Sequence, residues 1–396
     1  MRMEIQTLKR EAEAQREWLT HHRRRLHAFA ECGFNLPKTL NYVKNCLQSM
    51  GYSPRLVGKG GVVCTLKAVT SHAPTVLLRA DMDALPLQEE SRLSFRAENG
   101  NAHACGHDMH TAMLLGAAAL LRAHQKELPC HVRFFFQGAE EILCGARDGI
   151  DAGVLDGIAR AFMLHCAVAV PYPTGTVLLP HAGVGAPASV FFDLTLAGES
   201  AHAGMKSAGR DALFAGATLL CEASAFAARN GEISFSVGKF SGGSAPNVVA
   251  ARATLAGTFR AYREEKVEEM RAHLLRLAKD ARERFGVTAT VRFGGACPPL
   301  VNDGEVLSAF TALLKKAEIP FVSPDGRSFA AEDFAAIAAR VPALAVAITA
   351  GQRGHGYEHP LHHPKVVFDE DALPYGALLY TLGALGKPII TRPPTA

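Results

Sequence analysis

Side chains that bind metals crowd into one short stretch of the sequence, HACGHDMH at residues 103–110. Its candidates are His103, Cys105, His107, Asp108 and His110. Cysteine thiolate and neutral imidazole are good ligands for zinc-like divalent metals, although a single cysteine or histidine is usually structural. Because Glu141 and His165 follow downstream, the combined set indicates a metal site. It holds more candidates than one closed tetrahedral zinc requires, which favours a catalytic site over a structural one.

The adjacent carboxylates Glu140 and Glu141 suggest a division of labour. Neighbouring residues at a strand end point in different directions, so one carboxylate can bind metal while the other holds the attacking water. A bound metal lowers the pKa of water from about 16 towards 7, and a nearby glutamate can pass the proton to a leaving amine. This chemistry is hydrolysis without a covalent intermediate. The sequence lacks the motifs of competing chemistries, namely GxGxxG after a strand, GxxxxGK, HExxH and GxSxG.

A third group of candidates lies in the segment GHGYEHPLHHP: His355, His359, His362 and His363. Pro360 and Pro364 favour an extended, loop-like backbone, because the residue before a proline is restricted to extended conformations. One or two of these imidazoles can therefore be aimed at a site formed elsewhere. By composition alone, a loose histidine-rich loop is an equally good interpretation.

The elements that must position these residues follow from short apolar runs alternating with helical segments. Strands are predicted at residues 62–66, 76–78, 132–136, 161–164 and 344–348, and a helix at 111–128. This pattern is typical of an α/β fold with a mostly parallel sheet covered on both faces. Ligands bind beyond the carboxyl ends of such strands. Asp81 with Asp83, Glu140 with Glu141, and His165 each end a predicted strand, so we expect them at one edge.

The middle third of the chain has a different pattern. Strands are predicted at residues 190–197, 233–237, 253–260 and 287–293, with helices at 211–228 and 264–285. The order βαββαβ is the ferredoxin-like split motif, which closes on itself as a compact α+β unit. We therefore expect a catalytic α/β domain of residues 1–185 and 297–396, interrupted by an α+β domain of residues 186–296.

The composition is that of an ordinary globular protein, with 396 residues, 48% hydrophobic, 20% charged and a formal net charge of +4. This small positive excess gives no reason to expect a nucleic-acid partner, and the basic run at 21–25 is interpreted as a solvated helix face. No charge-free apolar stretch reaches the ~18 residues of a membrane span, and no apolar secretory segment begins the chain. Nine scattered cysteines do not form a disulfide framework, so we expect a protein of the reducing cytoplasm.

Several of these motifs resemble one known family. HACGHDMHT at 103–111, RADMDALP at 79–86, GAEE at 138–141 and LHHP at 361–364 are similar to aminoacylase/carboxypeptidase-type zinc metallopeptidases. More narrowly, they resemble the amidohydrolase branch with hippurate hydrolases, N-acyl-amino-acid deacetylases and plant auxin-conjugate hydrolases. Further similarity runs along nearly the whole chain, including GESAHAG at 198–204, GGSAPNVV at 242–249 and AEDF at 331–334. The resemblance implies a zinc-peptidase-like sheet domain with the inserted ferredoxin-like unit as a lid that usually dimerises.

The resemblance also implies a role for each matching position. A pair of divalent ions (zinc, manganese, cobalt or nickel) would be held by Cys105, His107, Glu141, His165 and His362. Glu140 matches the general base, and Asp83 matches a supporting acidic position. In the lid, His202 matches the group that stabilises the tetrahedral oxyanion, and Asn247 matches a residue that reaches the substrate, often in the neighbouring subunit. Arg260 is a candidate for the substrate carboxylate, although it could equally be a solvated charge.

Two segments depart from the family pattern. Residues 204–209 lack the family's Pro–His pair, and Lys206 adds a cation near the expected substrate path. FAECGFNLPKT at 29–39 also differs from the commoner form. Neither change touches a predicted ligand, so we expect activity to be kept and substrate choice to differ. The choice of His362 over His363 as a ligand depends on the resemblance alone.

The sequence thus predicts a cytoplasmic, metal-dependent amidohydrolase that cleaves the amide of an N-acyl amino acid and binds neither nucleic acid nor membrane. The resemblance adds the expectation of a homodimer formed through the lid. The alternative on the same two-metal site is a dipeptidase or aminopeptidase, which would require recognition of a free α-amino group. A catalytically silent binding protein with this fold would not need Glu140. A structural zinc used for assembly would give about one bound metal per chain and no hydrolysis.

Overall fold

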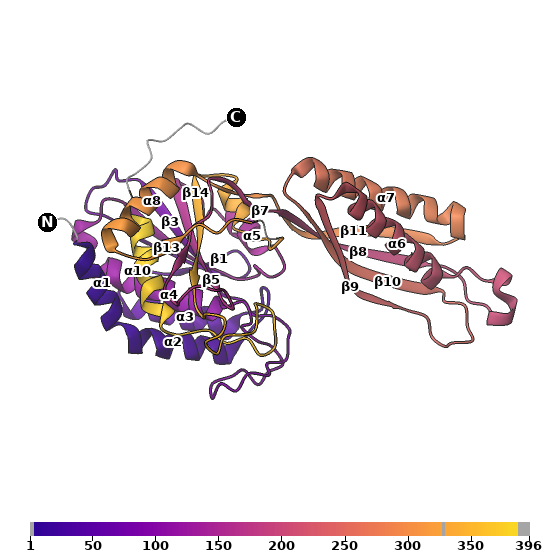
Figure 1. Cartoon of the computed structure of the whole chain (residues 1–396), viewed down its shortest axis with the longest axis horizontal. Helices are drawn as coiled ribbons and strands as arrows, with labels where there is room; N and C mark the ends of the chain where they lie inside the picture. The colour runs from indigo at the N-terminus through magenta and orange to yellow at the C-terminus, as the bar shows by residue number, and fades with distance from the viewer. Residues whose placement is uncertain (1–3, 327–328, 387–396) are drawn as a thin grey trace. The chain divides into compact units, whose positions relative to one another are not determined.

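The computed structural model describes residues 4–326 and 329–386, which form two compact units (Figure 1). Unit 1 contains the chain up to Gly185, the segment Val301–Gly326 and the chain from Asp333 onward. Unit 2 contains Ala186–Leu300 and a short segment ending at Glu332. From the sequence, residues 297–300 and this short segment were assigned to the catalytic domain instead. Residues 1–3, 327–328 and 387–396, also assigned from the sequence to that domain, lie outside the described residues.

An eight-stranded mixed sheet forms the middle of unit 1, in the order β1-β2-β4-β3-β5-β14-β6-β13. Its strands are β1 (Arg55–Val57), β2 (Gly61–Leu66), β3 (Thr75–Asp81), β4 (His131–Gln137), β5 (Ile158–Ala167), β6 (Val177–Leu178), β13 (Phe321–Val322) and β14 (Ala343–Thr349). The central strands β4, β3, β5 and β14 run parallel, which confirms the predicted mostly parallel sheet. Strands β2 and β6 join antiparallel, a feature that apolar runs do not reveal because they carry no signal of strand direction.

Helices cover both faces of this sheet. They are α1 (Ile5–Ala14), α2 (Arg16–Phe29), α3 (Pro37–Ser49), α4 (His107–Ala123), η1 (Gln125–Glu127), α5 (Gly145–Asp151), α8 (Gly304–Ala317), α9 (Ala335–Ala338) and α10 (Ala372–Leu385). Side chains of a strand alternate between faces, and in β4 Phe134 and Phe136 join the large core that contains α4 and α10. Phe135 instead faces α5, where a Cβ on Gly149 would lie 2.5 Å from the ring. The glycine therefore allows α5 to approach the opposite face.

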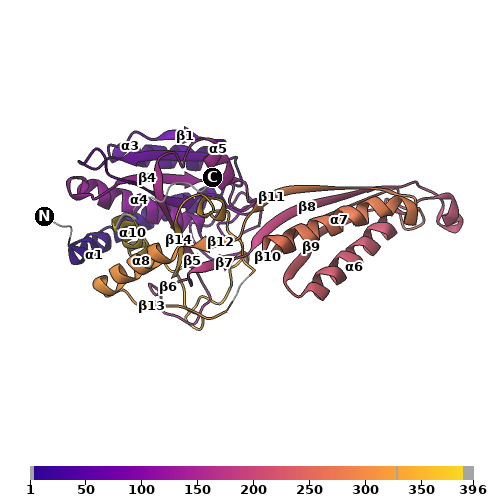
Figure 2. The ribbon, with the colours of Figure 1, turned by 90° about the horizontal axis from the view of Figure 1, so that it is seen from above.

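Unit 2 is a four-stranded antiparallel sheet with two helices on one face (Figure 2). Its elements are β8 (Ala188–Ala197), α6 (Ala212–Asn230), β9 (Ile233–Gly242), β10 (Arg252–Ala261), α7 (Glu264–Phe285) and β11 (Thr288–Cys297). The strand order β11-β8-β10-β9 is that of the ferredoxin-like motif predicted from the sequence. Alternate residues of β8, such as Phe192 and Leu194, are buried in one core with α6 and α7. A separate two-stranded sheet pairs β7 (Gly183–Ala186) with β12 (Leu300–Asn302).

Helix α6 is long and apolar enough to cross a membrane by length and composition, with 33% of its apolar window buried. Because α6 contains Glu222 and Arg229, it is not the charge-free apolar stretch that the sequence analysis expected to be absent. A single such helix is weak evidence of a membrane span, because core helices pass the same test. Here Glu222 pairs with Arg284 of α7, and Leu219 belongs to the core of unit 2.

Candidate metal centre and active site

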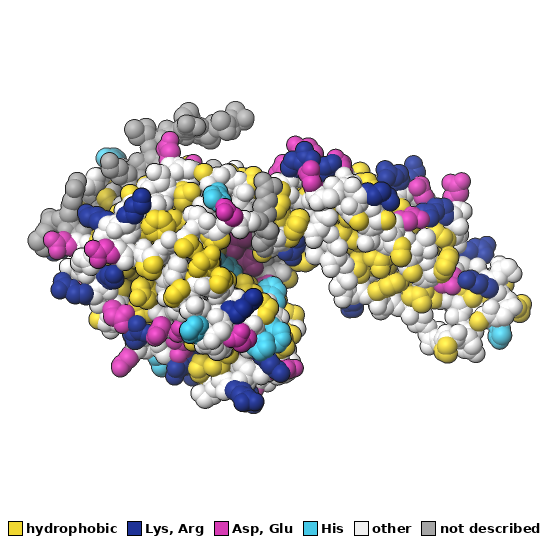
Figure 3. Space-filling view, viewed as in Figure 1, with side chains coloured by type: hydrophobic (Ala, Val, Ile, Leu, Met, Phe, Trp, Pro, Cys, Tyr) yellow, Lys and Arg dark blue, Asp and Glu magenta, His cyan; other side chains and the backbone are white. Residues whose placement is uncertain are grey.

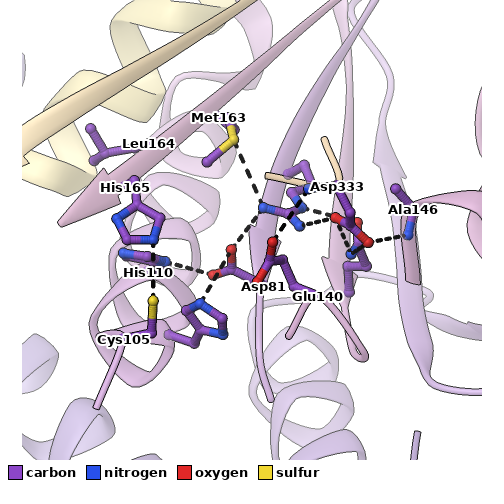
Figure 4. Close-up of polar contacts among 12 residues, drawn as sticks. Asp81, Cys105, His110, Glu140, Ala146, Met163, Leu164, His165 and Asp333 are labelled. Atoms are coloured by element: carbon purple, nitrogen blue, oxygen red, sulfur yellow. Dashed lines mark hydrogen bonds and ion pairs between the residues drawn. The ribbon is translucent and has the colours of Figure 1, made fainter. Parts of the chain in front are cut away.

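The carboxyl ends of β3, β4 and β5 bring the predicted acidic and imidazole side chains to one edge of the sheet (Figure 4). Strand β3 lies between β4 and β5 and runs parallel to both. It ends at Asp81, which is in register with Gln137 at the end of β4. Glu140 and Glu141 follow β4 directly, and His165 lies close to the end of β5. Side chains from distant parts of the sequence therefore meet because the strands are parallel neighbours.

His107 begins α4, four residues before the predicted start of the helix. Gly106 precedes it with φ 86°, a left-handed conformation that favours glycine, and a Cβ there would lie 3.1 Å from the Phe368 ring. Nδ1 of His107 donates to the main-chain carbonyl of Asp83 at 2.8 Å. This bond fixes the tautomer and leaves Nε2 as the ligating nitrogen. Nε2 is buried and has no hydrogen-bond partner.

His165 is oriented by the same device. Its Nδ1 donates to the carbonyl of Cys166 at 2.8 Å, and its Nε2 lies 3.6 Å from Sγ of Cys105. Burial raises the pKa of the Cys105 thiol well above its ordinary value, and the nearby Glu141 carboxylate adds to the rise. A bound cation would reverse this preference, because a coordinating thiol loses its proton.

Five groups of side chains in the described part of the chain could hold metal ions, and three of them, which overlap, consist only of the predicted ligands and Glu140. These three are Cys105 with His107 and His165, Cys105 with Glu141 and His362, and His107 with Glu140 and Glu141, and in each the ligand atoms lie within 4.8 Å of one another. Oε1 of Glu141 is buried without a hydrogen-bond partner, 3.9 Å from Nε2 of His107 and 3.5 Å from Nε2 of His362. Since divalent zinc binds nitrogen and oxygen at about 2.0–2.2 Å, atoms at these separations can share an ion. The donor set fits a metal centre, and the overlap of the groups fits more than one ion.

His362 reaches this cluster from the histidine-rich loop. Its N–H donates to the carbonyl of Ala104 at 2.9 Å, and its φ is 65°. The ring of His363 instead stacks on that of His359, with ring centroids 4.1 Å apart. The structure thus places His362, rather than His363, beside the cluster. Figure 3 shows a group of histidine side chains on the visible face of unit 1, and His355 and His362 are both exposed.

The electrostatics of the cluster suit a cation. Burial raises the pKa of Glu141 to about 7, and the charges of Asp83 and Asp81 add to the rise. Burial also opposes charge on His107, but Asp81 and Cys105 outweigh it and hold the pKa of His107 well above its ordinary value. Buried carboxylates that crowd one another in this way are stabilised by a divalent ion among them.

His110 lies in a candidate group with Asp81 and His107, but we do not count it among the ligands. Its Nδ1 donates to Oδ1 of Asp81, and its Nε2 accepts the N–H of Cys166 at 2.8 Å. Both ring nitrogens are therefore used within the protein. His110 instead orients Asp81, whose other oxygen lies 3.7 Å from Nε2 of His107.

Asp108 and His103 are absent from all five groups. Oδ2 of Asp108 lies 2.8 Å from Nε of Arg23 and 2.8 Å from Nδ1 of His27, all of them buried. His103 is buried, and burial lowers its pKa to about 3. Some of the candidate side chains in HACGHDMH therefore support the first turn of α4 instead of binding metal. The sequence could not separate ligands from support, because the partners Arg23 and His27 come from a different helix.

Glu140, the candidate general base, is fixed in the loop after β4. Oδ1 of Asp83 accepts the N–H of Glu140 at 3.0 Å, and Oδ2 accepts the N–H of Glu141 at 3.2 Å. Oε1 of Glu140 accepts the N–H of Asp333 at 3.3 Å. Asp333 and Arg79, which pair nearby, were not identified as site residues from the sequence. Their signal was present, since both lie in the family-like segments AEDF and RADMDALP.

The other three predicted residues belong to unit 2, whereas the metal-ligand candidates belong to unit 1. His202 is exposed and precedes the short helix η2 (Ala203–Ala208), and its Nδ1 accepts the N–H of Gly204 at 3.1 Å. Asn247 lies beside it, since its carbonyl accepts the N–H of Ala203 at 3.0 Å. Arg260, on β10, is not in this pair and donates to the carbonyl of Phe329.

The unusual segment 204–209 lies within and just after η2. Lys206, predicted to lie near the substrate path, has its Nζ 4.0 Å from Oδ2 of Asp211 and 4.9 Å from the ring centroid of Phe214. Both partners belong to unit 2, at the start of α6. The Lys206 cation is therefore directed at the start of α6 in this structure.

Known proteins are similar to this chain along most of its length. Residues 77–384 match the peptidase family M20/M25/M40. The chain is 32% identical to N-acetyl-L-cysteine deacetylase of Bacillus subtilis strain 168 over 357 residues, which cover 89% of this chain and 83% of the relative. It is also 32% identical to IAA-amino acid hydrolase ILR1-like 5 of Arabidopsis thaliana over 378 residues, 92% of this chain and 85% of the relative. The crystal structure of Bacillus subtilis YXEP protein, described as a dinuclear metal binding peptidase from the M20 family, superposes with a TM-score of 0.75 at 28% identity, covering 94% of this chain and 98% of that one.

Proposed function

The chain belongs to the peptidase family M20/M25/M40 and is a metal-dependent hydrolase of amide bonds, and we propose that its substrates are N-acyl amino acids. The observation that carries the proposal is the loop Glu140–Glu141. Glu141 lies in candidate metal groups with Cys105, His107 and His362, and we assign proton transfer to its neighbour Glu140, which Asp83 and Asp333 hold in place. A ligand and a proton acceptor side by side are what hydrolysis by activated water requires.

We assign the metal ligands to Cys105, His107, Glu141, His165 and His362. The buried, unpartnered Nε2 of His107 and Oε1 of Glu141 support this assignment. Bound there, a pair of divalent ions would polarise the amide carbonyl and acidify water. Zinc, manganese, cobalt and nickel all suit a set of thiolate, imidazole and carboxylate ligands.

The remaining residues supply the proton transfers and substrate contacts. Glu140 takes a proton from the attacking water and hands it to the departing amine. His202, from unit 2, donates a hydrogen bond to the oxyanion through Nε2, since Nδ1 already accepts the Gly204 N–H. Asn247, beside His202, contacts the substrate, and Arg260 is assigned to the substrate carboxylate.

We further propose that unit 2 acts as a lid and as the dimer interface of a cytoplasmic homodimer. Leu213, Phe214 and Phe240 of unit 2 are 38%, 55% and 38% exposed, and apolar side chains form a band on its visible face (Figure 3). Apolar surface of this kind is typical of a protein interface. In the described residues none of the nine cysteines forms a disulfide, which fits a reducing compartment.

The experiment for substrate class is primary-amine release from N-acetyl and N-benzoyl amino acids beside free dipeptides. Each substrate is tested with protein as purified, after chelation, and after zinc, manganese, cobalt or nickel is restored. Metal-restored cleavage of blocked substrates alone is the expected result. Cleavage of free dipeptides alone would favour the alternative, a dipeptidase or aminopeptidase on the same site.

A further inference from the structure

We propose that Asp333 is a positioning residue for Glu140, because its carboxylate clamps both ends of the loop that carries Glu140 and Glu141. The inference rests on the proposed function, since it gives Asp333 a part in the same reaction. We assign Asp333 no contact with the substrate or the reacting atoms, and it acts only through the loop.

The loop, residues 138–144, joins β4 to α5 in an unfavourable conformation. Ala139 and Leu143 have φ of 62° and 53°, in the left-handed region that residues with a Cβ rarely adopt. The ends of the loop also come very close, since a Cβ on Gly145 would lie 1.8 Å from the carbonyl oxygen of Gly138. Such a backbone persists only where its surroundings hold it in place.

The carboxylate of Asp333 provides that restraint from about two hundred residues further along the chain (Figure 4). Both of its oxygens accept from Nε2 of Gln137, the last residue of β4, at 2.9 Å. Oδ2 also accepts the N–H of Ala146, in the first turn of α5, at 2.8 Å. Asp333 is 2% exposed, so water does not compete for these bonds. One carboxylate thus joins the residue before the loop to the helix after it.

Arg79 supplies the positive charge that the buried Asp333 carboxylate requires. Its guanidinium donates to Oδ1 of Asp333 at 2.7 Å, to Oδ2 of Asp81 at 2.7 Å and to Oε1 of Gln137 at 3.0 Å. These charge-assisted bonds fix the direction of the carboxylate. Asp81 also bonds to His110 under the ligand cluster, so the clamp and the metal centre share one buried network.

The middle of the loop has a separate support. Asp83 holds the N–H groups of Glu140 and Glu141, whereas Asp333 holds the ends and donates its own N–H to Glu140. Loss of the Asp333 charge therefore leaves the ligands from other elements in place but loosens the general base. Misplacement of a catalytic group by roughly 1 Å can cost on the order of 10²-fold in rate.

The test is the substitution Asp333→Asn, which offers one acceptor where three donors converge. The expected result is a kcat lower by on the order of 10²-fold, a KM within about twofold of wild type and an unchanged number of bound metal ions. Amide hydrogen exchange at residues 138–146 is expected to quicken in both metal-free and metal-loaded protein. The matched control is Asp303→Ala, because Asp303 caps α8 by accepting the N–H groups of Glu305 and Val306. This control is expected to lower thermal stability without changing kcat or exchange in the loop.

A wild-type kcat in Asp333→Asn, or unchanged loop exchange, would overturn the positioning role. The role also fails if the Asp303→Ala control loses as much kcat as Asp333→Asn, because general destabilisation would then explain both. If the wild type hydrolyses none of the substrates, the proposed function fails, and the exchange measurement alone still decides whether the clamp exists. Should Asp333→Asn not give soluble protein, Gln137→Met removes one arm of the clamp and is judged by the same measurements.

Discussion

The candidate residues of unit 1 and unit 2 are held in contrasting ways. In unit 1, His107 and His165 are each fixed by a bond from Nδ1 to a main-chain carbonyl, and Glu140 is 6% exposed in a doubly supported loop. In unit 2, His202 is exposed, and its Nδ1 accepts a hydrogen bond from the next turn of its own segment. Arg260 is only partly buried.

This difference separates two parts of the chemistry. The groups to which we assign metal binding and proton transfer are pre-organised within unit 1, which reduces the cost of arranging them during the reaction. Groups assigned to the substrate lie on the surface of unit 2, where their side chains keep more freedom. Substitutions in unit 1 should therefore act on metal binding and proton transfer, and substitutions in unit 2 on the transition state without loss of metal.

Glu140→Gln is expected to have the largest effect, because it keeps the shape of the side chain but removes the proton acceptor. General acid–base catalysis contributes about 10²–10⁴-fold, and we expect a loss near the upper end of that range. Metal content, measured by mass spectrometry of the loaded protein, should stay at the wild-type value. Loss of metal, or turnover near wild type, would contradict the role given to Glu140.

Asp108→Ala tests the buried ion pair that supports the first turn of α4, and its effect is measured as the free energy of unfolding, not as activity. Arg23 and Asp108 form a buried ion pair at 2.8 Å, and breaking such a pair costs about 3–5 kcal/mol in the free energy of unfolding. We expect about 3 kcal/mol, because Arg23 keeps Glu370 as a partner. Glu222→Ala in unit 2 breaks a half-exposed pair and should cost less than about 1 kcal/mol. Denaturant unfolding measures the free energy of unfolding of both variants. Equal losses would contradict the expected difference between the buried and the half-exposed pair.

His202→Ala tests the unit 2 side of the contrast. Removal of an oxyanion donor lowers kcat by on the order of 10²-fold, and because His202 is exposed the thermal stability and metal content should not change. Steady-state kinetics on a cleaved N-acyl amino acid provides the measurement. An unchanged kcat would remove His202 from the mechanism.

His110→Ala should have the smallest effect of the four, because His110 reaches the assigned ligand His107 only through Asp81. Loss of an outer-shell partner typically weakens metal affinity by about 10–100-fold. Competition with a chelator of known affinity measures the change. Wild-type affinity would show that Asp81 does not need His110 for its orientation.

Much of the fold could be predicted from the sequence because its signals are local. The apolar run of β4 and the alternation in β8 each follow from a pattern within a few residues. The ferredoxin-like strand order followed from the element order alone. The antiparallel placement of β2 was not predictable in this way, since it depends on pairing between distant strands.

The site was predictable only in part, because it too depends on contacts between residues that are distant in sequence. Cys105 and His107 stand out by their spacing, but His362 required the family resemblance to be separated from His363. Arg79 and Asp333 lie in family-like segments, but they were missed because their buried pairing joins residues that are distant in sequence. Burial and pairing, rather than residue type, distinguish ligands from their supports.

Metal-dependent hydrolysis is tested most sharply by titrating metal into the metal-free chain while hydrolysis of an N-acyl amino acid is followed. We predict that activity rises with bound metal and reaches its plateau at about two ions per chain, with Glu140→Gln binding the same number without turnover. Saturation at about one tightly bound ion with no hydrolysis would contradict this prediction and favour a structural metal instead.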